Sequence, residues 1–471
     1  MAGDDTTNPL LAYGAWLAKS EFWPDEALAA AQDAFVDTIG VSIPGAAEPV
    51  TRTVLATVCQ WGDGQCAAIG SGVRLAAPWA ALVNGTAAHA LDFDDNFDPA
   101  KAHASAALVP AILALAEQEN TSGLACLDAY VAGLQIMGRV GQGLNPAHRN
   151  RGWHATGTVG AIGAAAACAR LLRLPAQEAA YALSISTSMA GGFMSQFGTM
   201  TKPLHAGLAA KAGLMAASLA RGGIDAGAGT LDGPTGMNRL MVGPDLEELR
   251  ANLTHVEHGQ TLRFETERVG EPLLILSSGL KVKRFPNCGS AHRAMDGLLA
   301  LRERCGFAAD NIAEVRVLAP ASHLANLMYR DPQTPAQAKF SLEYALAMIA
   351  LHGRCALRDF EEAAVTAGEA RRFYPRVRRV PVDKSEGQIP TRVEVTLEDG
   401  STHGIDVEMP VGSLAVPLSD GQYETKFDEC AAGFIAADGL ADLKGALKNL
   451  ANLESIAPVT DRLAQAWAHH G

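Results

Sequence analysis

Residues 197–207 read Phe197-Gly198-Thr199-Met200-Thr201-Lys202-Pro203-Leu204-His205-Ala206-Gly207, and this stretch predicts the start of a long helix. Proline suits the first turn of an α-helix but disfavours helical geometry in the residue before it. We therefore expect Lys202 just outside a helix that runs from Pro203 to about Arg221, where Gly222-Gly223 is a stop signal. A cation and a histidine beside a helix N-terminus can receive a carboxylate or another anion.

Helical patterns extend outward from this stretch. Large apolar residues at spacings of four, seven and four predict one buried stripe on the helix itself: Leu204, Leu208, Met215 and Leu219. No segment before Gly270 alternates like a strand. Further helices are predicted at about 8–19, 24–40, 47–60, 76–91, 106–118, 122–142, 154–172 and 176–188.

The pattern changes after about residue 270. Glu314–Leu318 alternates as a strand, and two further alternating segments, 391–397 and 403–407, flank a hairpin signal. Helices are expected up to about Glu303, over 336–352, and twice more after Tyr423. We therefore predict a mainly α protein. Its large all-helical domain comprises residues 1–270 and 415–471, and a smaller α+β lid domain is inserted at 271–414.

Composition narrows the class of protein. A formal net charge of −13 over 471 residues disfavours a nucleic-acid or anionic-membrane partner. The N-terminus lacks a basic region followed by an apolar run, and no apolar segment has the length of a membrane span. Eight scattered cysteines without a CxxC pair give no zinc signature and suit a reducing compartment. We expect a soluble, cytoplasmic protein.

The first chemical cluster lies in residues 84–105. His89, Asp92 and Asp95 or Asn96 are spaced to share one helical face before the breaker Asp98-Pro99, and the loop that follows carries Lys101, His103 and Ser105. Residues 94–98 also match DDxxD, the magnesium-diphosphate motif of helical isoprenoid synthases. The chain has no second acidic motif of that kind, and a proline follows Asp98.

The second cluster follows Arg151. Thr156 or Thr158 can cap a helix and place His154 beside its positive end, which favours a neutral, base-competent imidazole. Gly157, Gly160 and Gly163 predict close contact with another helix. Between Arg151 and Gly223 the sole acidic residue is Glu178, so this basic segment favours an anionic small molecule as ligand.

Six blocks of sequence, in this order, resemble the MmgE/PrpD family: NGTAAHALDFDD, KAHASAALVPAILALAE, GWHATGTVGAIGAAAA, FGTMTKPLHAGLAAKAG, FPNCGSAHRAMDG and AKFSLEYALA. The resemblance spans about residues 80–350. It implies a large helical domain with a smaller α+β domain, a homodimer, and catalysis without a metal or organic cofactor. Known family activities are 2-methylcitrate dehydratase, cis-aconitate decarboxylase and iminodisuccinate epimerase, which act on small polycarboxylates by proton transfer.

The resemblance also implies a set of site residues. The catalytic candidates carried over from it are Asp92, His103, His154, Lys202, His292 and Tyr329. The candidates for substrate binding are Asn96, Lys101, Arg151, His205 and Arg293. Lys202 would hold carboxylates, and either His103 or His154 would remove the proton. A histidine or Tyr329 would supply the acid, while Asp92 would orient a histidine. His89 is interpreted as a packing residue, and His205 as either a substrate contact or a helix cap.

Three functions remain open from the sequence. The first is a cofactor-independent lyase that dehydrates or decarboxylates a citrate- or aconitate-like acid. The second is an epimerase or isomerase of a dicarboxylate such as iminodisuccinate. An epimerase-like member of the family carries a tyrosine shortly before GWH, whereas residues 148–151 of this chain include none and offer Arg149 or Arg151 as an extra carboxylate ligand instead. The third is a non-catalytic helical scaffold.

Overall fold

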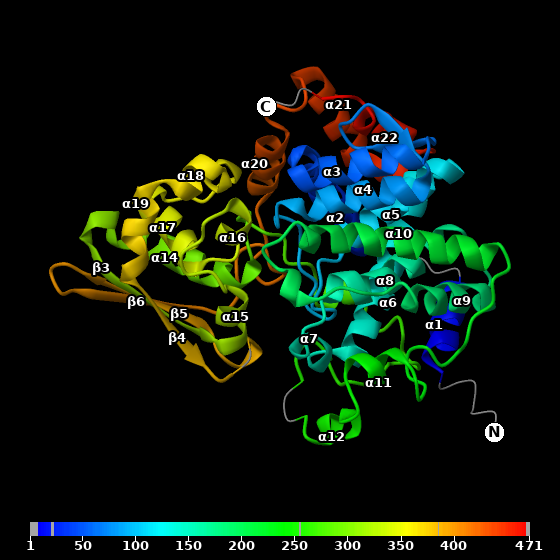
Figure 1. Cartoon of the computed structure of the whole chain (residues 1–471), viewed down its shortest axis with the longest axis horizontal. Helices are drawn as coiled ribbons and strands as arrows, with labels where there is room; N and C mark the ends of the chain where they lie inside the picture. Colours follow the sequence, from blue (N-terminus) through cyan, green and yellow to red (C-terminus); the bar gives the residue numbers. More distant parts are fainter. Residues whose placement is uncertain (1–7, 20–22, 254–255, 385, 468–471) are drawn as a thin grey trace. The chain divides into compact units, whose positions relative to one another are not determined.

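The computed structural model divides the chain into two units (Figure 1) and describes residues 8–19, 23–253, 256–384 and 386–467. Unit 1 contains residues 1–281 and 430–471, and unit 2 contains residues 282–429. The described parts of both chain ends therefore belong to unit 1. The expectation that the smaller unit acts as a lid stays a prediction.

Unit 1 is built almost entirely from helices that follow the predicted order. Its helices before residue 281 are α1 (Pro9–Leu17), α2 (Asp25–Ala47), α3 (Pro49–Val58), α4 (Ala77–Ala90), α5 (Ser105–Glu119), α6 (Gly123–Leu144), α7 (Ala147–Asn150), α8 (Ala155–Leu171), α9 (Ala176–Thr187), α10 (Thr201–Arg221), α11 (Met237–Met241), α12 (Leu246–Ala251) and α13 (Leu274–Ser277). Asn8 caps α1 by accepting a hydrogen bond from the Leu11 amide at 3.1 Å. A mainly α fold is confirmed.

The prediction that the large domain is all-helical was wrong in one detail. Strands β1 (Cys66–Ala68) and β2 (Val73–Leu75) form an antiparallel hairpin whose turn contains Gly70 and Gly72, both with positive φ. Strands of three residues are too short to establish a period-2 pattern, so the sequence could not distinguish them from a loop.

Helix α10 begins earlier than the proline rule predicts. It starts at Thr201, so Lys202 lies in its first turn rather than outside it. The Lys202 amide donates to the Thr199 carbonyl at 3.2 Å, which holds the residue before the proline in a turn. The end at Arg221 is confirmed, and Gly223 follows with φ of 96°.

The predicted leucine stripe on α10 is not its buried face. Leu208 and Leu219 are 36% and 42% exposed, and Leu204 and Met215 are half-buried. The buried face instead consists mainly of alanine and glycine, including Ala206, Gly207, Ala209, Ala210, Ala212, Gly213, Ala216 and Ala217. Helices can approach closely where side chains are small, so the intimate contact of neighbouring helices decides which face is buried.

The contact of α10 with α4 depends on two glycines. A methyl group at Gly207 would collide with the Leu82 carbonyl oxygen, and one at Gly85 would lie 2.8 Å from the Gly207 Cα. Lys211 lies over the Trp79 ring at 5.6 Å on one side of this crossing, and Lys202 meets His89 on the other. The two helices are therefore antiparallel. Figure 1 shows α10 between α4 and α8.

The predicted close helix contact at the glycines of α8 is confirmed. A methyl group at Gly163 would lie 2.7 Å from the Met137 Cβ on α6. Across the same interface, one at Gly133 would lie 2.6 Å from the Ala167 Cβ. This interface packs α8, whose N-cap residue is His154, against α6.

The C-terminal segment has three helices rather than the two predicted, α20 (Asp420–Ala431), α21 (Ala437–Lys448) and α22 (Ala457–Leu463). Within unit 1 the segment is tied to the N-terminal half by backbone hydrogen bonds. The Gly70 amide donates to the Leu463 carbonyl at 2.8 Å, and the Ile456 amide donates to the Thr121 carbonyl at 2.9 Å. No helix in the described ranges combines the length and apolar character that a membrane span requires.

Unit 2 packs helices on a mixed four-stranded sheet. Its elements are α14 (His292–Cys305), β3 (Ile312–Pro320), α15 (Ala321–Asn326), α16 (Pro335–Ala338), α17 (Leu342–His352), α18 (Glu362–Thr366), α19 (Gly368–Phe373), β4 (Val377–Val382), β5 (Thr391–Leu397) and β6 (Thr402–Val407). The strand order is β4-β3-β5-β6, with β3 parallel to β4 and the other pairs antiparallel. The predicted strand at 314–318 and the hairpin at 391–407 are confirmed.

Two features of unit 2 escaped the sequence pattern. Strand β4 contains Pro381 and lies at an edge of the sheet, where a proline is tolerated but obscures the strand signal. The helix expected over 336–352 is interrupted, because Ser341 starts α17 as an N-cap that accepts from the Tyr344 amide at 3.1 Å.

The glycine contact between α4 and α10 yields a prediction for stability. Gly207→Ala should lower the free energy of unfolding by about 1–3 kcal/mol, because the methyl group forces the two helices apart. Urea unfolding followed by circular dichroism measures the difference. The matched control is Gly445→Ala in the exposed helix α21, where nothing lies within 4 Å of an added methyl group and a gain of about 0.5–1 kcal/mol is expected. Equal effects of the two substitutions would contradict this account of the helix contact.

Candidate functional site

The first cluster forms where α4 ends. The helix stops at Ala90, and Asp92 adopts a left-handed conformation with φ of 54°, which aspartate tolerates better than most residues. The expectation that His89, Asp92 and Asp95 share one helical face was therefore wrong, because the helix ends before the carboxylates. The tight turn nevertheless directs His89 and Asp92 to one buried cation.

That cation is the ammonium group of Lys202. Its Nζ donates to Asp92 Oδ1 in a very short ion-paired hydrogen bond and lies 3.0 Å from His89 Nε2. His89 Nδ1 in turn lies 2.8 Å from Asp94 Oδ2. All four side chains are buried. A buried ion pair is tolerated when further hydrogen bonds satisfy both charges, and this chain of contacts provides them.

The contacts assign the tautomer of His89. An ammonium group can only donate, so His89 Nε2 accepts from Lys202 and Nδ1 carries the proton that is donated to Asp94. Burial, opposed by the charge of Asp94 and reinforced by that of Lys202, lowers the pKa of His89 to about 3. His89 is thus a neutral imidazole that links a carboxylate to an ammonium group.

His103 joins the same cluster from the loop before α5. Its backbone amide donates to Thr156 Oγ1 at 3.0 Å, which anchors the loop to the first turn of α8. His103 Nδ1 lies 3.3 Å from Asp94 Oδ2 and Nε2 lies 3.9 Å from Asp92 Oδ1. Asp94 therefore faces two imidazoles. Although burial opposes the shift, these imidazoles hold the pKa of Asp94 well below its usual value.

His154 and His205 complete the cluster. His154 is the N-cap residue of α8, and its Nδ1 lies 2.9 Å from His205 Nδ1. The sequence expectation that Thr156 or Thr158 caps this helix was wrong, since Thr156 serves the His103 amide and Thr158 faces His148 at 3.0 Å. Burial, followed by the charge of Lys202, lowers the pKa of both His154 and His205. Both imidazoles are therefore neutral near pH 7.

Asp92, His103, His154, Lys202 and His205 are thus brought together within unit 1 as a set. Sequence reasoning missed two members, His89, which was interpreted as a packing residue, and Asp94. The signal for His89 was available, because its helical spacing from Gly85 places it beside the crossing with α10. Asp94 gave no such signal, since its role depends on the turn after Ala90.

Asp95, the residue after Asp94, belongs to a second buried polar network. Ser105 is the first residue of α5. Its backbone amide donates to Asp95 at 3.3 Å, and its hydroxyl donates to the same carboxylate in a very short hydrogen bond. The same hydroxyl lies 2.6 Å from the Tyr130 hydroxyl. Burial raises the pKa of Asp95 to about 7. Asp95 therefore fixes the start of α5 rather than facing the Lys202 cluster.

Several predicted ligands have other partners. Lys101 Nζ lies 3.4 Å from Glu257, and the Asn96 backbone pairs with that of Lys281. Arg151 forms a half-exposed ion pair with Asp245. Two other cations of the basic segment also face acids elsewhere, as Arg170 pairs with Asp128 and Arg221 with Glu119. The segment is basic in sequence, but its arginines do not converge on the cluster.

The unit 2 candidates are placed within that unit. His292 begins α14 and packs edge-on against Phe285 at 5.4 Å. Arg293 Nη1 donates to the Ile389 and Glu408 carbonyls, each at 3.2 Å. The Tyr329 amide donates to the Phe340 carbonyl at 3.2 Å, and the side chain is half-buried. Their roles in catalysis stay predictions.

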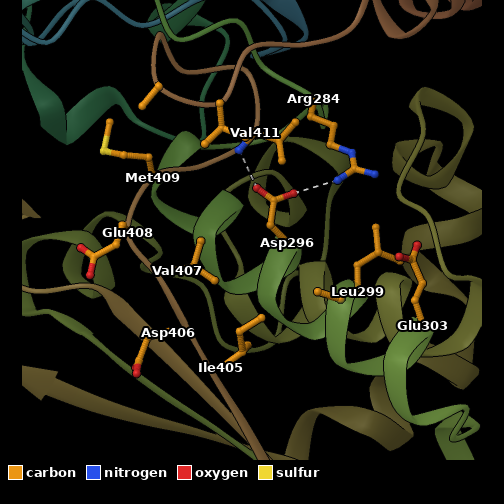
Figure 2. Close-up of a pocket in the computed structure, with 13 residues that line it drawn as sticks. Arg284, Asp296, Leu299, Glu303, Ile405, Asp406, Val407, Glu408, Met409 and Val411 are labelled. Carbon is orange, nitrogen blue, oxygen red and sulfur yellow. Dashed lines mark hydrogen bonds and ion pairs between the residues drawn. The ribbon is translucent and has the colours of Figure 1, made fainter.

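Unit 2 also contains a hollow of about 450 Å³ between α14, β6 and the segment that follows β6 (Figure 2). Asp296 lies in its wall, where Arg284 Nη1 donates to it at 3.0 Å and the Val411 amide at 2.9 Å. Both carboxylate oxygens are thus engaged, and much of the remaining wall is aliphatic. This hollow lacks the acid–base convergence seen around Lys202.

The Lys202 cluster contains donor atoms for a metal ion. Ligand atoms of His89, Asp92, Asp94 and His103 lie within 4.8 Å of one another. The ammonium group of Lys202 already contacts Asp92 and His89, so a divalent ion would have to displace a bound cation. The three aspartates of the DDxxD match do not face one common point. Asp94 faces His89 and His103, Asp95 accepts from Ser105, and Asp98 pairs with Lys281.

The chain is similar to known proteins over most of its length. Models of the MmgE/PrpD N-terminal domain and the MmgE/PrpD C-terminal domain match residues 13–249 and 285–449. The chain is 29% identical to a cis-aconitate decarboxylase from Homo sapiens over 411 residues, which cover 83% of this chain and 80% of the relative. It is 27% identical to a cis-aconitate decarboxylase from Aspergillus terreus over 471 residues, which cover 93% and 92%.

The buried ion pair yields a prediction for stability. Lys202→Met leaves the Asp92 carboxylate without its cation and should lower the free energy of unfolding by about 3–5 kcal/mol. Adding Asp92→Asn to that variant should recover part of the loss, because the uncompensated charge disappears. Denaturant unfolding of both variants measures the coupling.

A matched surface pair provides the control for this prediction. Arg221→Met, which breaks the partly exposed pair with Glu119, should change the free energy of unfolding by no more than about 1 kcal/mol. If Lys202→Met were as stable as Arg221→Met, or the double variant less stable than Lys202→Met alone, the buried pair would not carry the stability assigned to it.

Proposed function

The chain belongs to the MmgE/PrpD family, and from this premise we propose that it is a lyase acting on a small polycarboxylate by acid–base proton transfer. The observation that carries the proposal is the buried chain Asp94–His89–Lys202–Asp92, flanked by the neutral imidazoles of His154 and His205. A non-catalytic scaffold has no use for several buried ionisable groups that converge on one point, because each of them costs free energy to bury.

Of the two lyase reactions, we propose decarboxylation of a cis-aconitate-type acid as the preferred one. Relatives that match most of this chain carry the name cis-aconitate decarboxylase. Loss of CO₂ leaves an electron pair delocalised towards the remaining double bond and carboxylate, and an acid then adds a proton to carbon. Dehydration of a 2-methylcitrate-type acid would use the same groups. In that reaction a base removes a proton from carbon and an acid protonates the leaving hydroxyl.

The residues have distinct roles in this proposal. Lys202 would contact a substrate carboxylate and stabilise the negative charge that develops during the reaction. His103 or His154 would transfer the proton, since a neutral imidazole can accept one near neutral pH. Asp92 would hold Lys202, and Asp94 would orient His89 and His103. His292 and Tyr329 are implied by the family resemblance as further contributors.

We propose that the reaction needs no metal ion or organic cofactor, since Lys202 supplies the positive charge that a Lewis acid would otherwise provide. The family resemblance also implies a homodimer. We therefore propose that two copies of the 49.2 kDa chain associate. Sedimentation velocity would give a single species of twice this mass, whereas a monomer at micromolar concentration would refute the dimer.

The function is tested by proton NMR in D₂O with EDTA-treated protein and four acids: cis-aconitate, 2-methylcitrate, citrate and iminodisuccinate. We expect one of them to lose CO₂ or water. Lys202→Met should reduce kcat by at least about 10³-fold, since it removes charge stabilisation from the site. The matched control is Lys211→Met on the same helix, which lies over Trp79 outside the cluster and should keep its activity.

The outcomes of this experiment separate the alternatives. Deuterium entering the α-carbon without loss of a group would establish an epimerase instead of a lyase. Activity restored only by a divalent metal ion would overturn the cofactor-free mechanism. If Lys202→Met remained folded, as judged by circular dichroism, and as active as Lys211→Met, the Lys202 cluster would not be the active site.

A further inference from the structure

The contact between His154 and His205 joins the same nitrogen atom of two imidazoles. Their Nδ1 atoms lie 2.9 Å apart, and both side chains are almost fully buried. A hydrogen bond needs one donor and one acceptor, so one Nδ1 carries a proton and the other does not. The tautomers of the two rings are therefore coupled. When the shared proton is on His154 Nδ1, Nε2 of His154 has no proton and can act as a base. When the shared proton is on His205 Nδ1, Nε2 of His154 carries a proton and can act as an acid.

The surrounding backbone holds this pair in place. A methyl group at Gly192, whose φ is 136°, would lie 3.1 Å from His205 Nδ1. One at Gly157 would collide with the Gly191 carbonyl oxygen. The His154 amide donates to the Gly192 carbonyl at 3.0 Å, and the ring of Phe197 packs edge-on against that of His154 at 5.0 Å. The glycines thus leave room for His205 and fix His154 against it.

We propose that His205 is a positioning residue that exchanges a proton with His154 and thereby switches His154 between its acid and base forms. This inference rests on the proposed lyase function and deepens it. His205 acts through His154 and does not itself touch the reacting carbon.

The proton exchange balances in each turnover. In the acid form His205 carries the Nδ1 proton and His154 carries a proton on Nε2. When His154 gives its Nε2 proton to the substrate carbanion, a new C–H bond forms, and the Nδ1 proton of His205 moves to His154 Nδ1. His205 then takes a proton from water at Nε2, so both rings stay neutral. To restore the acid form, His154 takes a proton from water at Nε2, its Nδ1 proton moves back to His205 Nδ1, and His205 releases its Nε2 proton to water. Each turnover therefore draws one net proton from water, and that proton ends in the new C–H bond.

Two other observations support a shared proton. Burial and the charge of Lys202 both disfavour an imidazolium ion at either ring, so the pair stays neutral while the proton moves. The alternative role of His205 as a helix cap is not realised, because its Nδ1 faces His154 and the amide of Thr201, the first residue of α10, donates to Thr199 Oγ1 at 3.2 Å.

The first test measures the tautomers directly and needs no substrate. Long-range ¹H–¹⁵N NMR of protein labelled with ¹⁵N-histidine, assigned through His154→Gln and His205→Asn, should give one ring protonated at Nδ1 and the other at Nε2. In His205→Asn the amide can still contact His154 but cannot pass a proton onward, so His154 should settle in one tautomer. Two rings that are both protonated at Nε2 alone would overturn the proposal.

The second test uses the kinetics of whichever acid is turned over. His205→Asn should lower kcat by about 10–100-fold with KM within about twofold, because proton delivery is slowed while binding is kept. His148→Asn is the matched control, since it removes another buried imidazole that bonds Thr158 instead of His154. Its kcat should stay within about twofold of wild type.

The outcomes keep this inference apart from the proposed function. An unchanged kcat in His205→Asn, or a raised KM with the same kcat, would overturn the relay and make His205 at most a substrate contact. Equal losses in His205→Asn and His148→Asn would mean that any buried imidazole matters and would also overturn it. A wild-type protein inactive on every acid would refute the proposed function, while the tautomer measurement would still decide whether the pair shares a proton.

Discussion

The bond between the Lys202 ammonium group and the Asp92 carboxylate is the interaction on which the site depends. Both groups are buried, so neither could persist there without the other. The bond exists because α4 and α10 cross closely at Gly85 and Gly207, where neither glycine places a side chain between the two backbones. The packing of the bundle and the chemistry of the site therefore have one common cause.

A bundle rich in alanine and glycine has a consequence for polar groups. Its helices pack so closely that buried polar side chains must find their partners in one another rather than in water. Around Lys202 they form a continuous chain, from Asp94 through His89 to the ammonium group and on to Asp92. Such networks hold tautomers and orientations, and a site for proton transfer requires both of these.

Much of the fold could be predicted from local signals. The apolar periodicity and the caps located most of the long helices of unit 1 to within a few residues, although α2 continues to Ala47 and not only to about residue 40. The alternating pattern located β3, β5 and β6. The failures had identifiable physical causes. Strands of three residues are too short to alternate, and Pro381 obscured the edge strand β4. On α10 large leucines suggested the buried face, whereas close packing buries the alanines.

The sequence by itself determined which residue types the site contains, since Asp92, His103, His154 and Lys202 stood out by spacing, context and family resemblance. Only the tertiary structure decided which atoms meet. In the structure His89 and Asp94 contact each other within the site, and Arg151 pairs with an acid at the surface. His154 and His205 contact each other through their Nδ1 atoms. Spacing along a chain reports what one helix or loop presents, whereas these contacts join side chains from different elements, and their geometry depends on how closely the helices pack.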